Sequence, residues 1–401
     1  MKYGIIVFKN TENIGDDIQS YAAAKLLPKV DYYIEREYID TFVPSKKEYV
    51  KTIMNGWFMH NKHNFFPSPY IAPLFISTHF SSYDTYGISS EWIKINSDYL
   101  KKYAPIGCRD KHSKEILDKF NIDSYVSGCV TLTLDKFDIK KSSEDYICCV
   151  DVSDKVTDHI KNNTDIKVIK KTHTLDINTN NKLSYEERFN NVESLLKLYQ
   201  NAKLVITSRL HCALPCIAIG TPVILIRDEK SIYYKDRINS FLDYLTYYSE
   251  KEFLDLNIKT ILKTKNEKLY LDVRNKIISN IKNSINVVND DISKLPDVID
   301  YKNIYVNRKK QIDKLLDIAS KRYLKTYNDN LDNKKAAEYW KKQYNDLLKT
   351  NSKALKQNDN YWKKQFNDLL LDKDKAVKIN DDYWRKEFNE LLEKMNNMNK
   401  E

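Results

Sequence analysis

Three observations predict the fold class of this chain: an α/β protein with two Rossmann-like domains facing a cleft, followed by a helical region and a long helical repeat tail. First, short apolar segments alternate with longer amphipathic ones, which is typical of βαβ units and parallel sheets. Second, this alternation occurs in two blocks that join near residues 135–145. Third, a final segment without Pro or Gly repeats a Tyr-Trp motif. The length of 401 residues agrees with two or three domains.

The first block is expected to form an N-terminal Rossmann-like domain over residues 1–140. Each expected strand is a short apolar run, and each expected helix carries a periodic apolar face. Strands are expected at 3–8, 74–80, 104–107 and 123–127, and helices near 17–27, 90–102 and 111–120. A polar loop over 10–16 leads into the first helix, and the segment 128–134 closes the block.

The second block is expected to form a C-terminal Rossmann-like domain over residues 141–240. Strands are expected at 146–151, 165–170, 203–206 and 222–226, and helices at 153–162, 184–200 and 210–219. A helical extension is expected over 241–330, where amphipathic segments are rich in Tyr and Lys and Pro296 is the main interruption.

The tail, residues 331–401, carries a repeat of 22 residues. The copies YWKKQYNDLL, YWKKQFNDLL and YWRKEFNELL begin at Tyr339, Tyr361 and Tyr383. Twenty-two residues are two periods of eleven, which keeps one apolar stripe aligned along a helix. The tail is therefore predicted to be an amphipathic helix or coiled coil that forms a homo-oligomer or binds a partner. Disorder in isolation and binding to a membrane interface are the alternatives.

Composition excludes several classes of function. Lys and Arg number 66 against 56 acidic residues, but the lysines are spread among Asp, Glu and Asn without a long basic run. We interpret most of these lysines as residues of solvent-exposed surfaces, and no nucleic-acid partner is expected. The opening MKYGIIVF fits a strand rather than a signal peptide. Because no apolar run approaches the roughly 18 residues that span a bilayer, a cytoplasmic protein without a transmembrane segment is expected.

The cysteines do not suggest a metal site. They form no C-x-x-C pair and have no His at zinc spacing, and Cys212 and Cys216 follow one helix face, as packing residues would. Free thiols and no metal are therefore expected. No G-x-G-x-x-G fingerprint for a dinucleotide is present either.

The strongest candidate site lies in residues 203–226, KLVITSRLHCALPCIAIGTPVILI. Here Ser208, Arg209, Leu210 and His211 follow a buried strand and open an apolar helix. Ligands of open α/β sheets bind at such strand ends, and the first turn of a helix attracts an anion. A guanidinium and an imidazole complete a site for a phosphate or carboxylate. The alternative is that Arg209 pairs with a structural carboxylate and His211 is a core histidine.

Three other polar segments also follow strands and are expected to meet the first at one edge of the fold. They supply Asn13, Gly15 and Asp16, then Arg109, and then His173. His79, at the end of the strand 74–80, is a further candidate.

Each of these residues also has a structural interpretation. Asp16 could cap a helix that begins at Asp17. Arg109 could form a surface ion pair with Asp110 or Glu115, and His79 could be purely structural.

These residues resemble motifs of the polysaccharide pyruvyl transferase family. The resemblance rests on the Asn-x-Gly-Asp turn, on GCRDKHSKEILDKFNI, on SGCVTLTL and most specifically on AKLVITSRLHCALPCIAIGTPVI, and it covers roughly residues 1–230. It implies a fold similar to the two-domain B-type glycosyltransferases. One departure is Gly128-Cys129, where many members carry Asp-Pro.

The resemblance also implies an activity: transfer of a pyruvyl group from phosphoenolpyruvate to a sugar of a surface glycan or its precursor, as a ketal, with no further cofactor. The N-terminal domain would lie on the acceptor side, and the enzyme would work in the cytoplasm or at the membrane beside glycan-assembly enzymes. The family's Arg-Leu-His, associated with phosphoenolpyruvate, falls on Arg209, Leu210 and His211, and its upstream arginine falls on Arg109.

Roles can be assigned as hypotheses from this donor chemistry. Phosphoenolpyruvate has a phosphate and a carboxylate, so Arg209 would hold the first and Arg109 the second. His211 would donate a proton, and His173 or His79 would accept one from the sugar. Asp16 would contact the acceptor, with Asn13, Gly15, Ser208 and Leu210 around the substrates.

Two other functions are left open. A glycosyltransferase using a nucleotide sugar would share the cleft and the arginines, and Glu229 would be its candidate for a ribose contact. A non-catalytic scaffold would use the repeat tail to recruit biosynthetic enzymes.

Overall fold

The computed structural model describes residues 1–58, 64–80, 88–227, 238–285 and 291–329, together with residues 342, 345, 346 and 349. Contacts divide the chain into two units, Met1–Lys325 and Thr326–Glu401. The predicted repeat over 331–401 lies outside the described residues, apart from those four helical positions, as does Glu229. The architecture below is that of the first unit.

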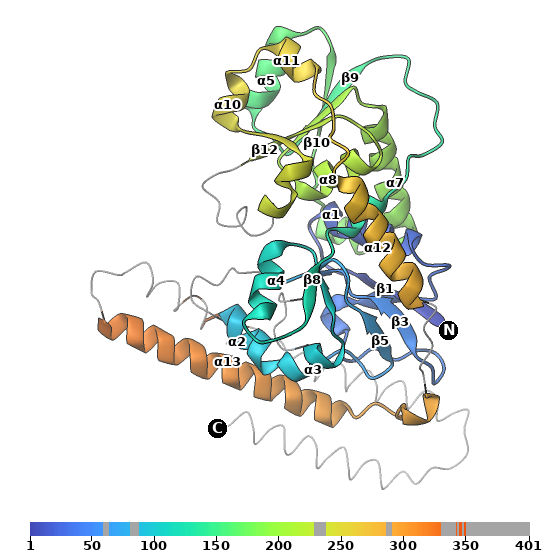
Figure 1. Cartoon of the computed structure of the whole chain (residues 1–401), viewed down its shortest axis with the longest axis vertical. Coiled ribbons are helices and arrows are strands. Elements are labelled where there is room, and N and C mark those ends of the chain that lie inside the picture. The colour runs from blue at the N-terminus through green and yellow to red at the C-terminus, as the bar shows by residue number, and fades with distance from the viewer. Residues whose placement is uncertain are drawn as a thin grey trace. The chain divides into compact units, whose positions relative to one another are not determined.

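The first sheet region contains only parallel strands. One sheet has the order β2-β1-β3-β5 and another the order β4-β6-β7-β8. Their bounds are β1 Lys2–Val7, β2 Tyr32–Glu35, β3 Val50–Ile53, β4 Gly56–Trp57, β5 Ile71–Leu74, β6 Thr78–His79, β7 Ile106–Cys108 and β8 Ser124–Val126. β4 follows β3 and β6 follows β5 almost directly, so the two sheets extend one another (Figure 1).

The helices of this region are α1 Ile14–Lys25, η1 Arg36–Tyr38, α2 Ile88–Ile95, α3 Ser97–Lys102 and α4 Lys111–Asp118, followed by η2 Val130–Thr133. Three sequence predictions need correction. The strand expected at 74–80 is broken at Ser77, whose φ of 59° leaves the extended region. The helix expected at 90–102 is two helices, because the buried Asn96 side chain bonds the Trp92 carbonyl at 2.8 Å. The first helix begins at Ile14 rather than Asp17.

The second sheet is also entirely parallel, with the order β10-β9-β11-β12-β13. Its strands are β9 Tyr146–Val150, β10 Lys167–Lys171, β11 Leu204–Thr207, β12 Val223–Arg227 and β13 Thr246–Ser249. Its helices are α5 Asp154–Asn163, α6 Ile177–Asn180, α7 Tyr185–Asn201 and α8 Leu210–Ala218. Every residue of α8 is buried, as its apolar sequence requires. These sheets confirm the α/β class with parallel strands; separate domains at 1–140 and 141–240 remain a prediction.

Two of the sheets, β2-β1-β3-β5 and β10-β9-β11-β12-β13, each reverse their strand order at one point. Ligands of such sheets bind at this point. In the first sheet the reversal lies between β1 and β3, and the chain leaves β1 toward the amino end of α1. In the second it lies between β9 and β11, which are followed by Asp151 and Ser208 respectively. The topology thus marks the same loops as the sequence motifs.

Hydrogen bonds connect the two sheet regions close to these loops. The Ile14 N–H donates to the His173 carbonyl at 2.9 Å, and the Leu175 N–H donates to the Glu12 carbonyl at 2.7 Å. In addition, Arg188 of α7 forms a buried ion pair with Asp17 of α1. One apolar core, including Ile18, Cys212 and Ile277, runs across both regions.

In the described ranges after β12 the regular elements are helices, apart from β13 of the second sheet, which the sequence analysis did not predict. Its elements are η3 Asn239–Tyr244, α10 Glu250–Leu254, α11 Ile258–Leu262, α12 Tyr270–Ile285, η4 Ile292–Lys294 and α13 Tyr301–Asp329. α12 packs against η2, and Arg308 of α13 bonds Asp40 through two contacts of 2.6 Å. No helix in the described ranges is long and apolar enough to cross a bilayer.

Candidate active site

Arg209 is held at the switch point of the second sheet by Asp151. It precedes α8 as the N-cap residue, and its Nε donates to an Asp151 carboxylate oxygen at 2.7 Å. The Arg209 side chain is 43% exposed, and its Nη groups make no hydrogen bond within the described part of the chain. The pair therefore orients the guanidinium and leaves its outer edge for a ligand.

The surroundings of Asp151 stabilise its charged carboxylate. Burial favours its neutral form, but hydrogen bonds from the Thr172 side chain, the His173 N–H and Arg209 outweigh burial and lower its pKa. Ser208 Oγ donates to the Asp151 carbonyl at 2.6 Å. Asp151 itself has a φ of 50°, in the left-handed region that Asp and Asn tolerate better than most residues.

His211 lies in the first turn of α8 against the start of α1. A Cβ placed on Gly15 would lie 3.1 Å from His211 Cβ and 3.3 Å from its Nδ1, so glycine lets the two helices approach closely. Asn13 caps α1, accepting from the Gly15 N–H at 3.0 Å. Leu210 packs in the apolar core, and its assignment as a substrate contact stays a prediction.

Asp16 does not cap α1, because Asn13 holds that position. Its carboxylate accepts from Thr11 Oγ1 at 2.6 Å and from Gln19 Nε2 at 3.5 Å. Gln19 Oε1 in turn accepts from Arg109 Nη1 at 3.4 Å. Gln19 therefore connects Asp16 to Arg109, which sequence reasoning placed in one site without a connecting residue.

Arg109 is 1% exposed, so it is not the surface ion-pair partner that one interpretation proposed. Its Nε lies 3.7 Å from the Asp110 carboxylate, too far for a hydrogen bond. Among the described residues, its Nη2 has no hydrogen-bond partner. Because a buried charged group normally has its hydrogen-bonding capacity satisfied, this guanidinium is suited to an anion that the protein does not itself supply.

Asp110 forms its hydrogen bonds with residues other than Arg109. It caps α4 by accepting from the Ser113 N–H at 2.8 Å, and His79 Nδ1 lies 2.6 Å from its other oxygen. Burial favours the neutral carboxyl, but His79, Arg109 and the Ser113 N–H outweigh it and lower the pKa of Asp110 to about 2. His79 thus supports Asp110, the structural role that the sequence analysis left open.

His173 lies in the same region but is enclosed. Its backbone carbonyl bonds the Ile14 N–H and its own N–H donates to Asp151 at 2.9 Å. Its Nε2 lies 2.9 Å from the Tyr199 hydroxyl, and the side chain is buried. The backbone of His173 therefore helps to join the loops, and Tyr199 determines how the ring is oriented.

Sequence reasoning missed Asp151, Gln19 and Tyr199. Asp151 carried a usable signal, since it follows the apolar strand YICCV directly, and polar residues after a strand had already selected Ser208 and Arg209. Gln19 and Tyr199 gave none, because each lies inside a helix and acts through a contact distant in sequence. Among the described residues, no cluster of His, Cys, Asp and Glu has the geometry of a metal site, and all six cysteines are free and buried.

The fold and these loops define an α/β protein whose cationic groups gather at the carboxyl ends of parallel strands. The family model "Polysaccharide pyruvyl transferase" matches residues 13–229, more than half of the chain, and includes Asn13, Arg109, His173 and Arg209. The chain belongs to the polysaccharide pyruvyl transferase family, as its motifs predicted.

Comparison with solved structures gives remote similarities. A functionally uncharacterised protein from Klebsiella pneumoniae has 14% identity and a TM-score of 0.38, with 61% of this chain and 93% of that chain covered. UDP-GlcNAc 2-epimerase from Methanocaldococcus jannaschii, in complex with UDP-GlcNAc and UDP, has 13% identity and a TM-score of 0.38, with 71% and 100% covered. MnaA from S. aureus with UDP has 12% identity and a TM-score of 0.41, with 75% and 100% covered. No curated protein sequence matches the chain.

Proposed function

We propose that this protein transfers a pyruvyl group from phosphoenolpyruvate to a sugar of a surface polysaccharide or its precursor, forming a pyruvate ketal. One observation carries the proposal: α1 contacts both Arg109, which is buried, and His211, which lies two residues after the exposed Arg209. Arg109 bonds Gln19, and His211 packs on Gly15. Family membership supports the same activity.

The phosphate of the donor would bind at the start of α8. Arg209 offers its outer guanidinium edge there, and the first turn of the helix offers N–H groups and a positive dipole end. Ser208 lies beside them. This end of the site is open, as release of inorganic phosphate requires.

The carboxylate of the donor would bind Arg109. Within the described ranges its Nη2 lacks an acceptor, and its Nη1 has only a long contact to Gln19. A carboxylate satisfies both through a fork-shaped pair of hydrogen bonds. The binding of phosphoenolpyruvate would thus remove the cost of a buried, incompletely bonded cation.

The chemistry needs an acid and a base but no oxidant or reductant. The methylene carbon of phosphoenolpyruvate gains a proton and becomes a methyl group, which leaves cationic character on the adjacent carbon. Two sugar hydroxyls then bond to that carbon, and its bond to the phosphate oxygen breaks. Of the two hydroxyl protons, one is balanced by the proton in the new methyl group and the other leaves with phosphate.

His211 is the residue we assign to the proton transfer to carbon, since it adjoins both Arg209 and Gly15. His173 is assigned to the sugar hydroxyl, and Asp16 with Asn13 to the acceptor. His79 supports Asp110, whose carboxylate lies 3.7 Å from Arg109 Nε. A positioned acid or base contributes roughly 10²- to 10⁴-fold in rate.

The test is a phosphate-release assay with phosphoenolpyruvate and a panel of sugar acceptors, with ketal formation followed by mass spectrometry. The wild-type protein is expected to release phosphate only with an acceptor, and His211→Ala to lose about 10²-fold or more in turnover. Saturable binding of a nucleotide sugar with no binding of phosphoenolpyruvate would favour the glycosyltransferase instead. Wild-type turnover in His211→Ala would refute the role of that histidine.

A further inference from the structure

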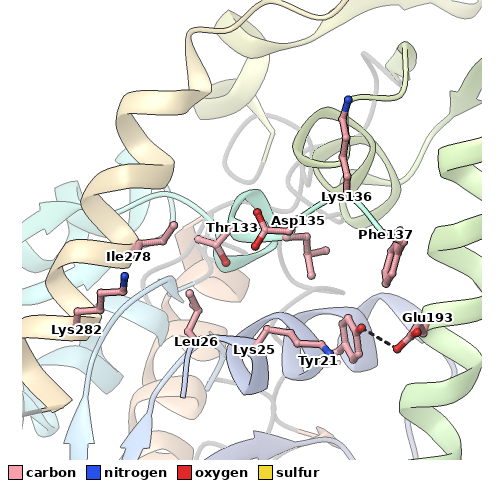
Figure 2. Close-up of a pocket in the computed structure, with 11 residues that line it drawn as sticks. Tyr21, Lys25, Leu26, Thr133, Asp135, Lys136, Phe137, Glu193, Ile278 and Lys282 are labelled. Carbon is pink, nitrogen blue, oxygen red and sulfur yellow. Dashed lines mark hydrogen bonds between the residues drawn. The ribbon is translucent and has the colours of Figure 1, made fainter. Parts of the chain in front are cut away.

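A separate cavity of about 440 Å³ lies at the other end of α1 from the candidate active site. It is lined by the carboxyl-terminal half of α1, the segment 133–137, α7 and α12. Figure 2 shows Tyr21 and Lys25 projecting from α1, Glu193 from α7 and Lys282 from α12. The cavity has the size of a small-molecule site, and no candidate active-site residue lines it.

The charges around this cavity are unbalanced in favour of cations. Lys25, Lys136 and Lys282 line it, and in the described ranges none of them forms an ion pair with a carboxylate. Its two carboxylates are already paired with cations outside the lining. Arg274 Nη2 lies 2.5 Å from Asp135, and Lys197 Nζ lies 2.8 Å from Glu193. Lys25, whose Nζ lies 5.0 Å from the centroid of the Tyr21 ring, and Lys282 are therefore left for an anion. The Lys136 side chain instead lies against Gly220 and points away from both (Figure 2).

The donor types indicate which anion. Lysine ammonium groups act as separate point charges, whereas planar carboxylates are usually recognised by the fork of an arginine. No arginine of the described ranges lines this cavity. Two lysines on different helices, Lys25 of α1 and Lys282 of α12, suit a phosphate group, whose oxygens point in several directions.

The remaining lining suits a hydroxylated body attached to that phosphate. Glu193 accepts from the Tyr21 hydroxyl at 3.0 Å and retains further lone pairs. Asp135 and Thr133 add acceptors, and the Phe137 ring gives an apolar face. Acceptors for hydroxyl groups beside one aromatic face and a phosphate site form the combination expected for a sugar.

We propose that this cavity is a second binding site, for a sugar phosphate, distinct from the transfer site. Its occupant would contact α1, α7 and α12 together. These helices belong to both sheet regions and to the segment after them, so binding stabilises their packing. Because Lys25 and Lys282 are exposed, binding weakens as salt is added.

The experiment is isothermal titration calorimetry of the full chain with glucose 6-phosphate, glucose and inorganic phosphate. Glucose 6-phosphate is expected to bind saturably and more tightly than either fragment. The double variant Lys25→Gln/Lys282→Gln is expected to weaken that binding at least about tenfold, the effect of losing one charged hydrogen bond. The double variant Lys161→Gln/Lys276→Gln is the control, since it removes the same charge from exposed positions outside the cavity.

A third variant, Arg209→Gln, separates this site from the transfer site and is expected to leave the affinity unchanged. No binding of glucose 6-phosphate would overturn the proposal. Equal weakening by both lysine double variants would overturn it too, as would loss of binding in Arg209→Gln. Inorganic phosphate binding as tightly as glucose 6-phosphate would overturn the assignment to a sugar phosphate.

Discussion

At the scale of single residues, Arg109 shows that a side chain can be poorly satisfied in the free protein and well suited to a ligand. Its guanidinium is buried, its Nε lies 3.7 Å from the Asp110 carboxylate, and its Nη2 has no hydrogen-bond partner in the part of the chain that the structure describes. Leaving such a group unbonded costs roughly 1–3 kcal/mol, more when it is charged. Proteins retain such groups at sites where function requires them.

Arg109→Met is therefore expected to separate stability from activity. The apolar side chain has a similar length and needs no hydrogen bonds, so the melting temperature should stay the same or rise. Phosphate release from phosphoenolpyruvate should fall by about 10² or more, because a charged ligand group loses its partner. Thermal unfolding and the phosphate assay check the two halves. A large fall in melting temperature with activity retained would show that Arg109 is structural.

Asp151 acts on Arg209, so its variant should affect donor binding. Asp151→Asn keeps a residue that tolerates a φ of 50° but removes the charge that orients Arg209. The KM for phosphoenolpyruvate is expected to rise about tenfold, with a smaller change in kcat. Asp154→Asn is a matched control, since Asp154 is an exposed surface partner of Lys170. An unchanged KM in Asp151→Asn would show that Arg209 needs no orientation.

At the scale of elements, the sequence predicts best the bounds of helices and strands that are buried on all sides. The bounds expected for β11, α8 and β12 differ from those observed by one residue at most, because continuous apolar runs between polar turns leave few alternatives. β3 and β13 read VKTI and TYYS. Such short mixed segments carry too little periodicity to be recognised. What makes them strands is pairing with distant partners, which no local pattern records.

α4 links helix capping to the candidate site through Asp110. The pKa of Asp110 is lowered from 3.8 to about 2 in the fold. Its charged form therefore stabilises the protein above pH 3.8, and this contribution is lost as pH falls through 2.

Asp110→Asn is expected to lower the free energy of unfolding at pH 7 by about 2 kcal/mol. The variant should also lose stability less steeply than wild type between pH 4 and pH 2. Urea unfolding across this range measures both effects. Asp118→Asn, on the exposed end of the same helix, is the control and should change stability by less than about 0.5 kcal/mol. Parallel pH profiles for Asp110→Asn and wild type would contradict the assignment.

At the scale of the whole molecule, α1 is the element that relates the separate features. Its first turn contacts His211, and through Gln19 it reaches Arg109. Its middle is tied to α7 by Asp17 and Arg188, and its last turn lines the second cavity. The sequence indicated which strand ends would meet, because parallel strands share one edge. It could not indicate that one helix would join them, since that depends on contacts between residues far apart in sequence, such as Asp17 with Arg188 and Gly15 with His211.

The repeat tail leads to a prediction about the whole molecule that is independent of the chemistry. Its apolar stripe needs a partner surface, because a long isolated helix with one apolar face gains little stability from propensity alone. Deleting residues 331–401 is expected to reduce the oligomeric mass measured by light scattering while turnover with phosphoenolpyruvate is kept. A matched full-length variant with Trp340, Trp362 and Trp384 changed to Gln should show the same loss of mass, since it retains the length and removes the stripe. An unchanged mass in both proteins would mean that the repeats do not pair with one another. Loss of turnover in the deletion alone would place the tail in the catalytic unit instead of in assembly.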